Sequence, residues 1–465
     1  MMRPLLSARE RAILLPAAMA LLAGLGGCKE VTVPNYNAPS TDQLLTNPTA
    51  ATVNTTVAGL LVGIRGSVGT WATGLGVLGR EVLNLDGAEP RNVNAYLIGP
   101  LEPGGFGVDQ GWTATYRNLR TAVTLLDAVE KVPDYTPAQK AAVRGFVKTV
   151  MAQDYVNLLR VRDTFGIVLD VNPDPTVLGD FVSREEGYAR AAALFDEGKA
   201  DLAAGGAAFP FKLTAGFAGF DTPVNFLRVN RGLKARMDVY RGRWDDALAS
   251  LGESFINTAA TTPAALAAGA YHVYSTASGD ATNPLYDAGP RALVAVPDFL
   301  TDAQHRADGS IDRRASSKAQ VMPTSLSTQG VSSNVRITVY ASNVAPVPWI
   351  KNEELILLRA EAHNGLGNRP AAIADLNFVR VNSGGLDPLP ANYAGDLVDE
   401  ILYNRRYSLF DEYGHRWVDS RRYGRLEQLP KALPTHRVFP LVPIPVDECN
   451  QRTPEPKGCV NVLGF

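Results

Sequence analysis

Three pairs of neighbouring acidic residues are the first candidates for chemistry in this sequence: Asp245-Asp246, Glu353-Glu354 and Asp411-Glu412. Hydrolysis of a glycosidic bond needs two carboxyl groups about 5–9 Å apart on either side of that bond. Each pair lies in a segment of helical periodicity, where adjacent residues point to different faces of the helix. We therefore predict ion pairs or solvated faces for these acids and no enzymatic activity. A surface glycosidase is the alternative that a convergent pair would support.

Signals for metal or phosphate chemistry are weak. The five histidines are scattered, and Glu412-Tyr413-Gly414-His415 lacks the first histidine of a zinc-protease helix. Residues 308–312 place oxygen ligands at short spacing but lack the twelve-residue pattern of a calcium loop, so a turn is favoured. No glycine-rich phosphate motif follows a predicted strand. We predict neither a metal site nor a cofactor.

Aromatic residues outside the helical patterns point to binding rather than to catalysis. Capture of a sugar needs flat aromatic faces, with polar groups at the rim for the hydroxyls. We predict that some of six residues in glycine-rich or polar stretches form such a platform, although each of them alone also suits packing: Trp71, Tyr96, Phe106, Tyr271, Tyr274 and Tyr286. Trp112, Trp244 and Trp417 lie in helical or motif contexts, where we predict packing.

A dense set of charges lies in residues 405–419, which we expect to form a helix. Residues four apart are neighbours on a helix, so Glu412 can pair with Arg416, and His415 with Asp419. We predict a structural ion-pair network here that holds the helix to the body and has no catalytic role. It would include Arg406, Glu412, Arg416 and Asp419.

The first 28 residues are typical of an export signal. Three arginines precede an apolar stretch over residues 12–25, and Gly26-Gly27-Cys28 follows. The stretch is short for a membrane-spanning helix, which is the alternative. Residues 25–28 resemble the bacterial lipoprotein signal, in which the peptide is cut before a cysteine that then carries lipid. We predict a signal peptide over residues 1–27 and a membrane anchor at Cys28, since several acyl chains on one residue anchor a protein stably.

The two remaining cysteines, Cys449 and Cys459, lie ten positions apart near the C-terminus. In an exported protein we predict that they form a disulfide that closes a surface loop. A metal site would need further histidine or cysteine ligands nearby, and none follows.

Composition indicates a folded chain with a large core. The 465 residues are 46% hydrophobic and 20% charged, which excludes wholesale disorder. With a net charge of −2, the chain has no overall basic field to hold a polyanion, so nucleic-acid binding is not expected.

Helical periodicity dominates the chain after a polar, proline-containing arm over residues 28–50. We predict a single domain over residues 51–465, with a helical scaffold in 111–256 and 349–425, a loop-rich insertion in 257–348 and an irregular segment in 426–465. The expected helices cover residues 112–131, 136–161, 184–204, 223–240, 245–256, 349–365, 370–381 and 397–413.

Two of the helical hairpins resemble each other. Residues 233–236 precede a turn at Gly242, and residues 358–361 precede a turn at Gly367 at the same offset. Small residues at the helix crossing and a glycine at the turn match the tetratricopeptide repeat, although chance similarity between helical hairpins is the alternative. We predict a mainly α fold of stacked, tetratricopeptide-like hairpins.

Several motifs follow one another in the C-terminal third. A helix that ends in Ala360-Glu361-Ala362 precedes a Gly-Leu-Gly turn, and residues 376–380 read Leu-Asn-Phe-Val-Arg. The charged segment 405–424 and a proline motif at 439–445 come next. In this order the motifs resemble those of the RagB/SusD family of outer-membrane nutrient-uptake lipoproteins. The resemblance spans nearly the whole mature chain, but the cysteine loop near the C-terminus departs from the family pattern.

This resemblance implies a helical fold of four tetratricopeptide-like units with an irregular ligand-facing part. It implies a partner, a TonB-dependent β-barrel transporter of the SusC type, over which the lipoprotein sits as a lid. The ligand would be an oligosaccharide or a peptide, and the location the outer membrane, exposed at the cell surface. A tetratricopeptide-type envelope scaffold that binds no nutrient is the alternative.

Overall fold

The computed structural model describes residues 41–289 and 292–465. The predicted signal peptide, the predicted lipidation site Cys28 and residues 28–40 of the predicted arm lie outside this part of the chain. Residues Thr41–Phe465 form one compact unit. Among the described residues, no helix is both long enough and apolar enough to cross a membrane.

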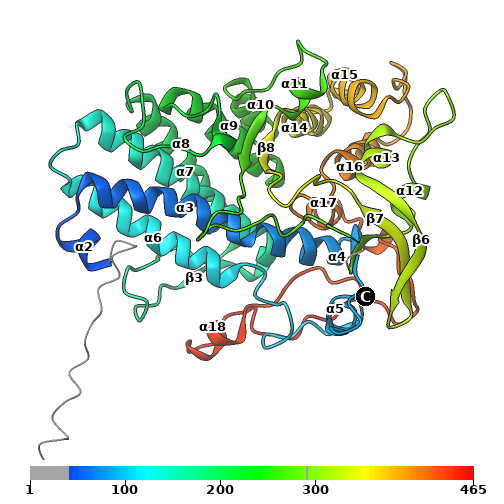
Figure 1. Ribbon diagram of the computed structural model, residues 1–465, viewed down its shortest axis with the longest axis horizontal. Helices are drawn as coiled ribbons and strands as arrows, with labels where there is room; N and C mark the ends of the chain where they lie inside the picture. Colours follow the sequence, from blue (N-terminus) through cyan, green and yellow to red (C-terminus); the bar gives the residue numbers. More distant parts are fainter. Residues whose placement is uncertain (1–40, 290–291) are drawn as a thin grey trace, which may run out of the picture. The chain divides into compact units, whose positions relative to one another are not determined.

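Helices make up the scaffold (Figure 1), as the sequence predicts. The helices α3, α6, α7, α8 and α9 pack side by side in chain order, and α10, α14, α15 and α16 continue from them. The long helices are α3 (Ala50–Thr70), α6 (Trp112–Lys131), α7 (Pro137–Arg162), α8 (Arg184–Ala203), α9 (Pro223–Tyr240), α10 (Trp244–Gly252), α14 (Asn352–Gly365), α15 (Arg369–Val379), α16 (Leu397–Ser408) and α17 (His415–Arg422).

Local sequence sets where these helices begin. The side chain of Thr136 accepts a hydrogen bond from the backbone of Gln139, the side chain of Gln139 bonds back to the backbone of Thr136, and Pro137 occupies the first helical turn of α7. Ser183 and Glu186 form the same reciprocal cap on α8. Every residue of α7 from Val150 to its end is buried, so this helix lies at the centre of the scaffold.

The two similar segments form helical hairpins that pack on each other, α9 with α10 and α14 with α15. The turns contain Gly242 at φ 66° and Gly367 at φ 75°, a region that favours glycine. Between the hairpins, the guanidinium of Arg236 on α9 forms two hydrogen bonds with the carboxylate of Glu354 on α14, at 2.6 and 2.7 Å. Both side chains are almost fully buried.

Strands and short helices fill the segment between the two hairpins, and three further short strands precede the first hairpin. A four-stranded antiparallel sheet has the order β1-β5-β7-β6, with Val82 opposite Ala295 and Ala295 opposite Val335. Two further pairs join β2 to β3 and β4 to β8. The strands are β1 (Val82–Asn84), β2 (Ile167–Val168), β3 (Phe181–Val182), β4 (Gly269–His272), β5 (Leu293–Ala295), β6 (Ala319–Thr328), β7 (Val331–Ile337) and β8 (Val347–Lys351).

The remaining helical elements are short. They connect the long helices and the sheet, and several of them are single turns. They are α2 (Thr41–Thr46), η2 (Trp71–Leu75), α4 (Gly76–Leu78), α5 (Arg91–Val93), η3 (Asn94–Ile98), η4 (Asp163–Phe165), η5 (Ala215–Phe217), α11 (Pro263–Ala267), α12 (Asp298–Thr301), α13 (Arg313–Lys318), η6 (Arg380–Gly384), η7 (Leu426–Gln428) and α18 (Val446–Asn450).

The charged segment 405–419 is not one helix, so that prediction was wrong. Helix α16 ends at Ser408 and α17 begins at His415, with left-handed backbone at Asp411 and Gly414 between them. At this turn Gly414 packs closely against Leu75, so a side chain at position 414 would collide with it. The interruption moves Glu412 and Arg416 out of helical register with each other.

The four predicted network residues therefore have other partners than the sequence suggests. Glu412 pairs with Lys351 of β8, and Arg416 donates to the backbone oxygen of Arg80. The side chain of Asp419 accepts from Arg405 at 2.6 Å and from Arg422 at 2.8 Å, and Arg406 pairs with Asp302. These contacts join α16 and α17 to the sheet and to the helical scaffold, and none of them joins residues four apart.

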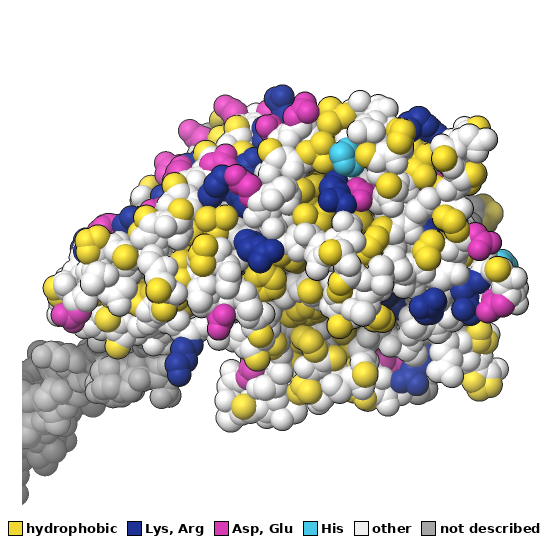
Figure 2. All heavy atoms as spheres, turned by 90° about the horizontal axis from the view of Figure 1, so that it is seen from above, with side chains coloured by type: hydrophobic (Ala, Val, Ile, Leu, Met, Phe, Trp, Pro, Cys, Tyr) yellow, Lys and Arg dark blue, Asp and Glu magenta, His cyan; other side chains and the backbone are white. Residues whose placement is uncertain are grey.

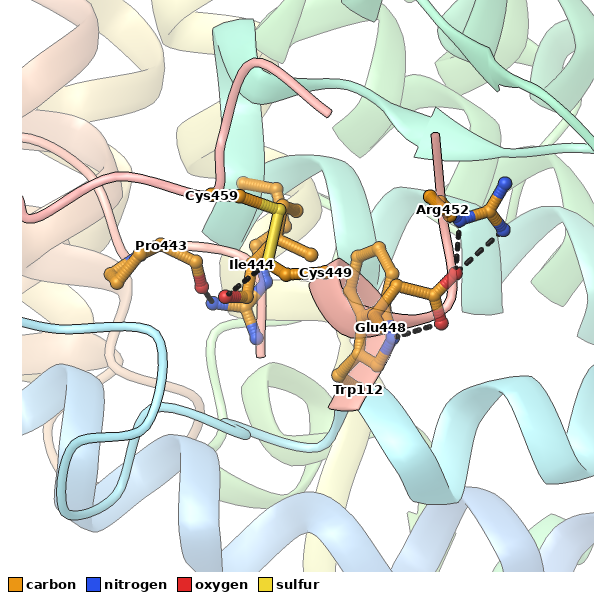
Figure 3. The surroundings of a disulfide bond; sticks show 8 residues. Trp112, Pro443, Ile444, Glu448, Cys449, Arg452 and Cys459 are labelled. Carbon is orange, nitrogen blue, oxygen red and sulfur yellow. Dashed lines mark hydrogen bonds and ion pairs between the residues drawn. A yellow bond between two sulfur atoms is a disulfide. The ribbon is translucent and has the colours of Figure 1, made fainter. Parts of the chain in front are cut away.

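The predicted disulfide between Cys449 and Cys459 is present. Figure 3 shows it beside Glu448 of α18, which accepts from the indole of Trp112 and pairs with Arg452. Nearby, the guanidinium of Arg162 on α7 donates to the backbone oxygen of Pro443 at 2.6 Å. The C-terminal segment is thus fixed to helices α6 and α7, far from it in sequence.

Candidate functional site

Trp71, the largest residue of the predicted ligand platform, lies in the core. Its side chain is 1% exposed, in the turn η2 that follows α3. The ring of Tyr413 stacks on it at 6.0 Å, and the guanidinium of Arg160 lies 4.8 Å from its centre. Its indole nitrogen donates to the backbone oxygen of Gln110 at 2.9 Å. This arrangement leaves Trp71 no free face for a ligand, contrary to the prediction.

Tyr96 is buried as well, and hydrogen bonds connect it to the surroundings of Trp71. Its hydroxyl accepts from the side chain of Gln110 at 2.9 Å and donates to the backbone oxygen of Gly107. Burial raises the pKa of Tyr96 to about 12. Phe106 is half-buried, packs edge-on against Tyr96 and carries the guanidinium of Arg91 over its ring at 4.7 Å.

The other three predicted aromatic residues lie in β4 and the loop after it. Tyr274 is buried, with the guanidinium of Arg65 5.3 Å from its ring centre, and burial raises its pKa to about 12. Tyr271 is half-buried and lines a small hollow of about 40 Å³ that Arg65 also lines. Tyr286 is half-buried against the core. Tyr271 and Tyr274 are thus brought together around Arg65, while Tyr96 and Phe106 form a separate pair.

A much larger cavity, of about 650 Å³, lies elsewhere on the helical scaffold. The start of α8, the end of α9, the turn into α10 and the helix α17 surround it. Its volume falls in the range of ordinary ligand sites, about 300–1,000 Å³. Five arginines and two acids line it, together with three tyrosines and a tryptophan: Arg184, Arg241, Arg243, Arg421, Arg422, Asp163, Glu185, Tyr188, Tyr240, Tyr423 and Trp244.

The acid Asp163 organises one wall of this cavity. It follows α7 with φ 46°, a conformation that residues other than glycine rarely adopt. Its carboxylate pairs with Arg184 at 2.7 Å and with Arg421 at 3.0 Å. Burial lowers the pKa of Arg421 below its usual value, although the negative charge of Asp163 opposes this shift. The nearby positive charges of Arg184 and Arg422 lower the pKa further.

Aromatic rings form much of the remaining lining. The guanidinium of Arg422 lies between the rings of Tyr240 and Tyr423, 4.8 and 5.3 Å from their centres. The ring of Trp244 packs against the backbone of α14 at Gly365, where a side chain would collide with it. Trp112 and Trp417 are buried, as predicted, whereas Trp244 is half-buried at the edge of the cavity.

Sequence reasoning did not identify this cavity. Arg421, Arg422 and Tyr423 belong to the charged segment, which we interpreted as structural, and Trp244 follows the repeat turn. The available signal was the sequence Arg241-Gly242-Arg243-Trp244, which places two arginines and an indole at one exposed turn.

Five of the six paired acids have the ion pairs, polar partners or exposure expected of them, but Asp411 contradicts the prediction: it is 1% exposed, and neither oxygen of its carboxyl group has a hydrogen-bond partner among the described residues. Asp245 and Asp246 are exposed on α10, and Glu354 pairs with Arg236. Glu353 accepts from the hydroxyl of Ser408 at 2.6 Å. No group of three or more histidine, cysteine or acidic side chains in the described part of the chain is placed to hold a metal ion. Figure 2 shows acidic and basic side chains interspersed on one face of the molecule.

Comparison with known proteins identifies the fold. No family model and no curated protein matches the sequence. Solved structures do match: a SusD superfamily protein from Bacteroides vulgatus has a TM-score of 0.69 at 16% identity, over 89% of this chain and 100% of that one. The Bacteroides fragilis protein NanU has a TM-score of 0.64 at 14% identity, over 93% and 99%.

A laminarin-binding SusD-like protein matches with a TM-score of 0.58 at 17% identity, over 88% of this chain and 99% of that one. The chain therefore has the SusD-like fold over nearly its full described length. This confirms the fold that the sequence motifs indicate.

Proposed function

We propose that this protein is a solute-binding lipoprotein of the outer membrane, which captures an oligosaccharide or a related nutrient outside the cell. It would deliver that nutrient to a TonB-dependent β-barrel transporter of the SusC type. The observation that carries the proposal is the SusD-like fold, which matches solved SusD-like proteins over almost their entire lengths. One of these is described as laminarin-binding and another as a carbohydrate-binding protein.

Binding without catalysis is consistent with the side chains of the described residues. The carboxylates of Glu354 and Glu412 have basic partners, and Glu353 has a hydroxyl partner. A glycosidase needs two carboxylates free to act on the substrate from opposite sides. We propose that ligand capture uses half-buried aromatic residues of β4 and the loop after it, such as Tyr271 and Tyr286, since the buried rings have no free face. Phe106 is not included, because it forms a separate pair with Tyr96.

The partner is tested by purifying the lipidated protein in mild detergent and identifying what co-purifies in stoichiometric amount. A large β-barrel protein supports the proposal. Purification alone, or with assembly factors, across several detergents would instead favour an envelope scaffold. The anchor is tested separately with Cys28→Ser, which should release the protein from the membrane fraction. Unchanged membrane association of that variant contradicts the lipoprotein assignment.

A further inference from the structure

The 650 Å³ cavity between α8, α9, α10 and α17 contains basic side chains whose charge is incompletely paired. Arg243 is exposed, and no hydrogen bond or ion pair of its side chain occurs among the described residues. Arg241 has only a long contact, 3.6 Å from its guanidinium to Asp238. That carboxylate also accepts from Lys234 at 2.8 Å, so it cannot fully compensate Arg241.

The other three arginines of the cavity already have partners and form its frame. Arg184 pairs with Asp163 and Glu185, and Arg421 pairs with Asp163. Arg422 pairs with Glu361 and Asp419, which lie behind the cavity wall. The donors left for a ligand are therefore those of Arg241 and Arg243, on either side of Gly242. The hydroxyl of Tyr188 on α8 also has no hydrogen-bond partner among the described residues.

Guanidinium groups bind carboxylates through two parallel hydrogen bonds, and each such charged bond is stronger than a neutral one. The cavity adds a second requirement on its ligand, because Trp244, Tyr423 and Tyr188 line it. Aromatic rings of this kind suit the C–H faces of sugar rings. The hydroxyl of Tyr188 is available to a sugar hydroxyl, whereas that of Tyr423 donates to Glu361 at 2.7 Å. One ligand that satisfies both requirements is a sugar that carries an acid group.

We propose that this cavity binds an acidic saccharide, with its carboxylate on Arg241 and Arg243 and a sugar ring against Trp244 and Tyr423. The saccharide part rests on the proposed function, whereas the choice of an acidic ligand rests on the incompletely paired charges of Arg241 and Arg243. This site is separate from the aromatic residues around Arg65, which are in β4 and the following loop. The acids Asp245 and Asp246 follow on α10 but do not line the cavity.

The test measures binding of matched saccharide pairs by titration calorimetry with the mature protein. Digalacturonic acid is compared with the neutral disaccharide of the same linkage and ring stereochemistry, and glucuronic and sialic acids are compared with neutral sugars of similar size. We expect the acidic member of at least one pair to bind at least about tenfold more tightly. Its affinity should fall as ionic strength rises, because the arginines are partly exposed.

Two variants connect this binding to the cavity. Arg241→Gln/Arg243→Gln should weaken binding of the acidic saccharide by roughly 10- to 100-fold. Arg144→Gln, which alters another partly exposed arginine with its own acidic partners and does not line the cavity, should leave the affinity unchanged. The double variant should keep the unfolding temperature of the wild type, because Arg243 has no structural contact and Arg241 only a long one.

The proposal is overturned if no acidic saccharide binds more tightly than its neutral counterpart, or if the double variant binds like the wild type. Neutral saccharides that bind equally to the wild type and to the double variant would leave the proposed function intact while refuting this site. Binding of acetate or inorganic phosphate with the same affinity as the acidic saccharides would refute the role of the aromatic rings.

Discussion

The buried ion pair between the two helical hairpins gives a quantitative test of how they are held together. Arg236→Met removes a guanidinium that donates to both carboxylate oxygens of Glu354 and to the backbone oxygen of Trp349, all within 2.7 Å. The side chains of Arg236 and Glu354 are 4% and 2% exposed, so the variant leaves a carboxylate without a partner in the core. We expect a loss of about 3–5 kcal/mol in the free energy of unfolding.

A second substitution, at Glu354, separates the destabilisation caused by the unpaired carboxylate from that caused by lost packing. In Arg236→Met/Glu354→Met neither charge remains, and only the oxygen of Trp349 lacks its donor, which costs about 1–3 kcal/mol. The two substitutions should therefore couple by about 2 kcal/mol or more in a double-mutant cycle. The assay is equilibrium unfolding in denaturant, followed by circular dichroism.

Lys131→Met provides the control for this cycle. Lys131 pairs with Asp127 four residues away on α6, and the two side chains are 46% and 53% exposed. An exposed ion pair of this kind contributes less than about 1 kcal/mol to the free energy of unfolding. If Arg236→Met costs no more than Lys131→Met, or if the double variant is as unstable as the sum of the single variants, the ion pair does not hold the hairpins together as argued.

Three further predictions concern single elements. Burial raises the pKa of Asp154 to about 8 despite a hydrogen bond from Asn118. Because the folded protein then keeps a proton that the unfolded chain loses, the free energy of unfolding of the wild type should fall as pH rises from about 4 to about 8, by at most about 1.4 kcal/mol per pH unit. Asp154→Asn removes this dependence, and equal pH dependence of wild type and variant in unfolding experiments contradicts the prediction. Replacing Cys449 and Cys459 by alanine should lower the free energy of unfolding by about 3 kcal/mol, because the disulfide joins residues only 10 positions apart and so closes a short loop. The measurement is denaturation with and without reductant, and an unchanged midpoint would show that the disulfide does not stabilise the fold. Trp71→Ala should cost about 3–5 kcal/mol in unfolding experiments, as expected for a core residue, and full stability with weakened ligand binding would restore Trp71 to a ligand platform.

The helical scaffold could be predicted from the sequence because its signals are local. Thr136 and Pro137 mark the start of α7, and Gly242 and Gly367 mark the turns of the two hairpins. The break between α16 and α17 could not be predicted in this way. At this break Gly414 packs against Leu75, a residue far away in the chain, and helical periodicity does not report such a contact.

For the predicted site residues, too, contacts between distant segments could not be predicted from the sequence. Glycine-rich surroundings suggested that Trp71 and Tyr96 are accessible, but both rings are covered by residues from distant segments, such as Tyr413, or by Gln110. The large cavity escaped prediction for a related reason. Its lining comes from elements far apart in the sequence, and the incomplete pairing of Arg241 and Arg243 becomes apparent only when the neighbouring acids are placed.

The attachment of the C-terminal segment to the early part of the chain affects how this protein reaches its native state. The backbone nitrogens of Arg437, Val446 and Val462 donate to the oxygens of Leu97, Pro103 and Leu101, more than three hundred positions earlier. Contacts of such high contact order close the largest loops of the chain and form slowly. A ribosome would release the N-terminal helices long before their last partners emerge. Nascent molecules would therefore expose apolar surface, and chaperones are the natural protection during that interval.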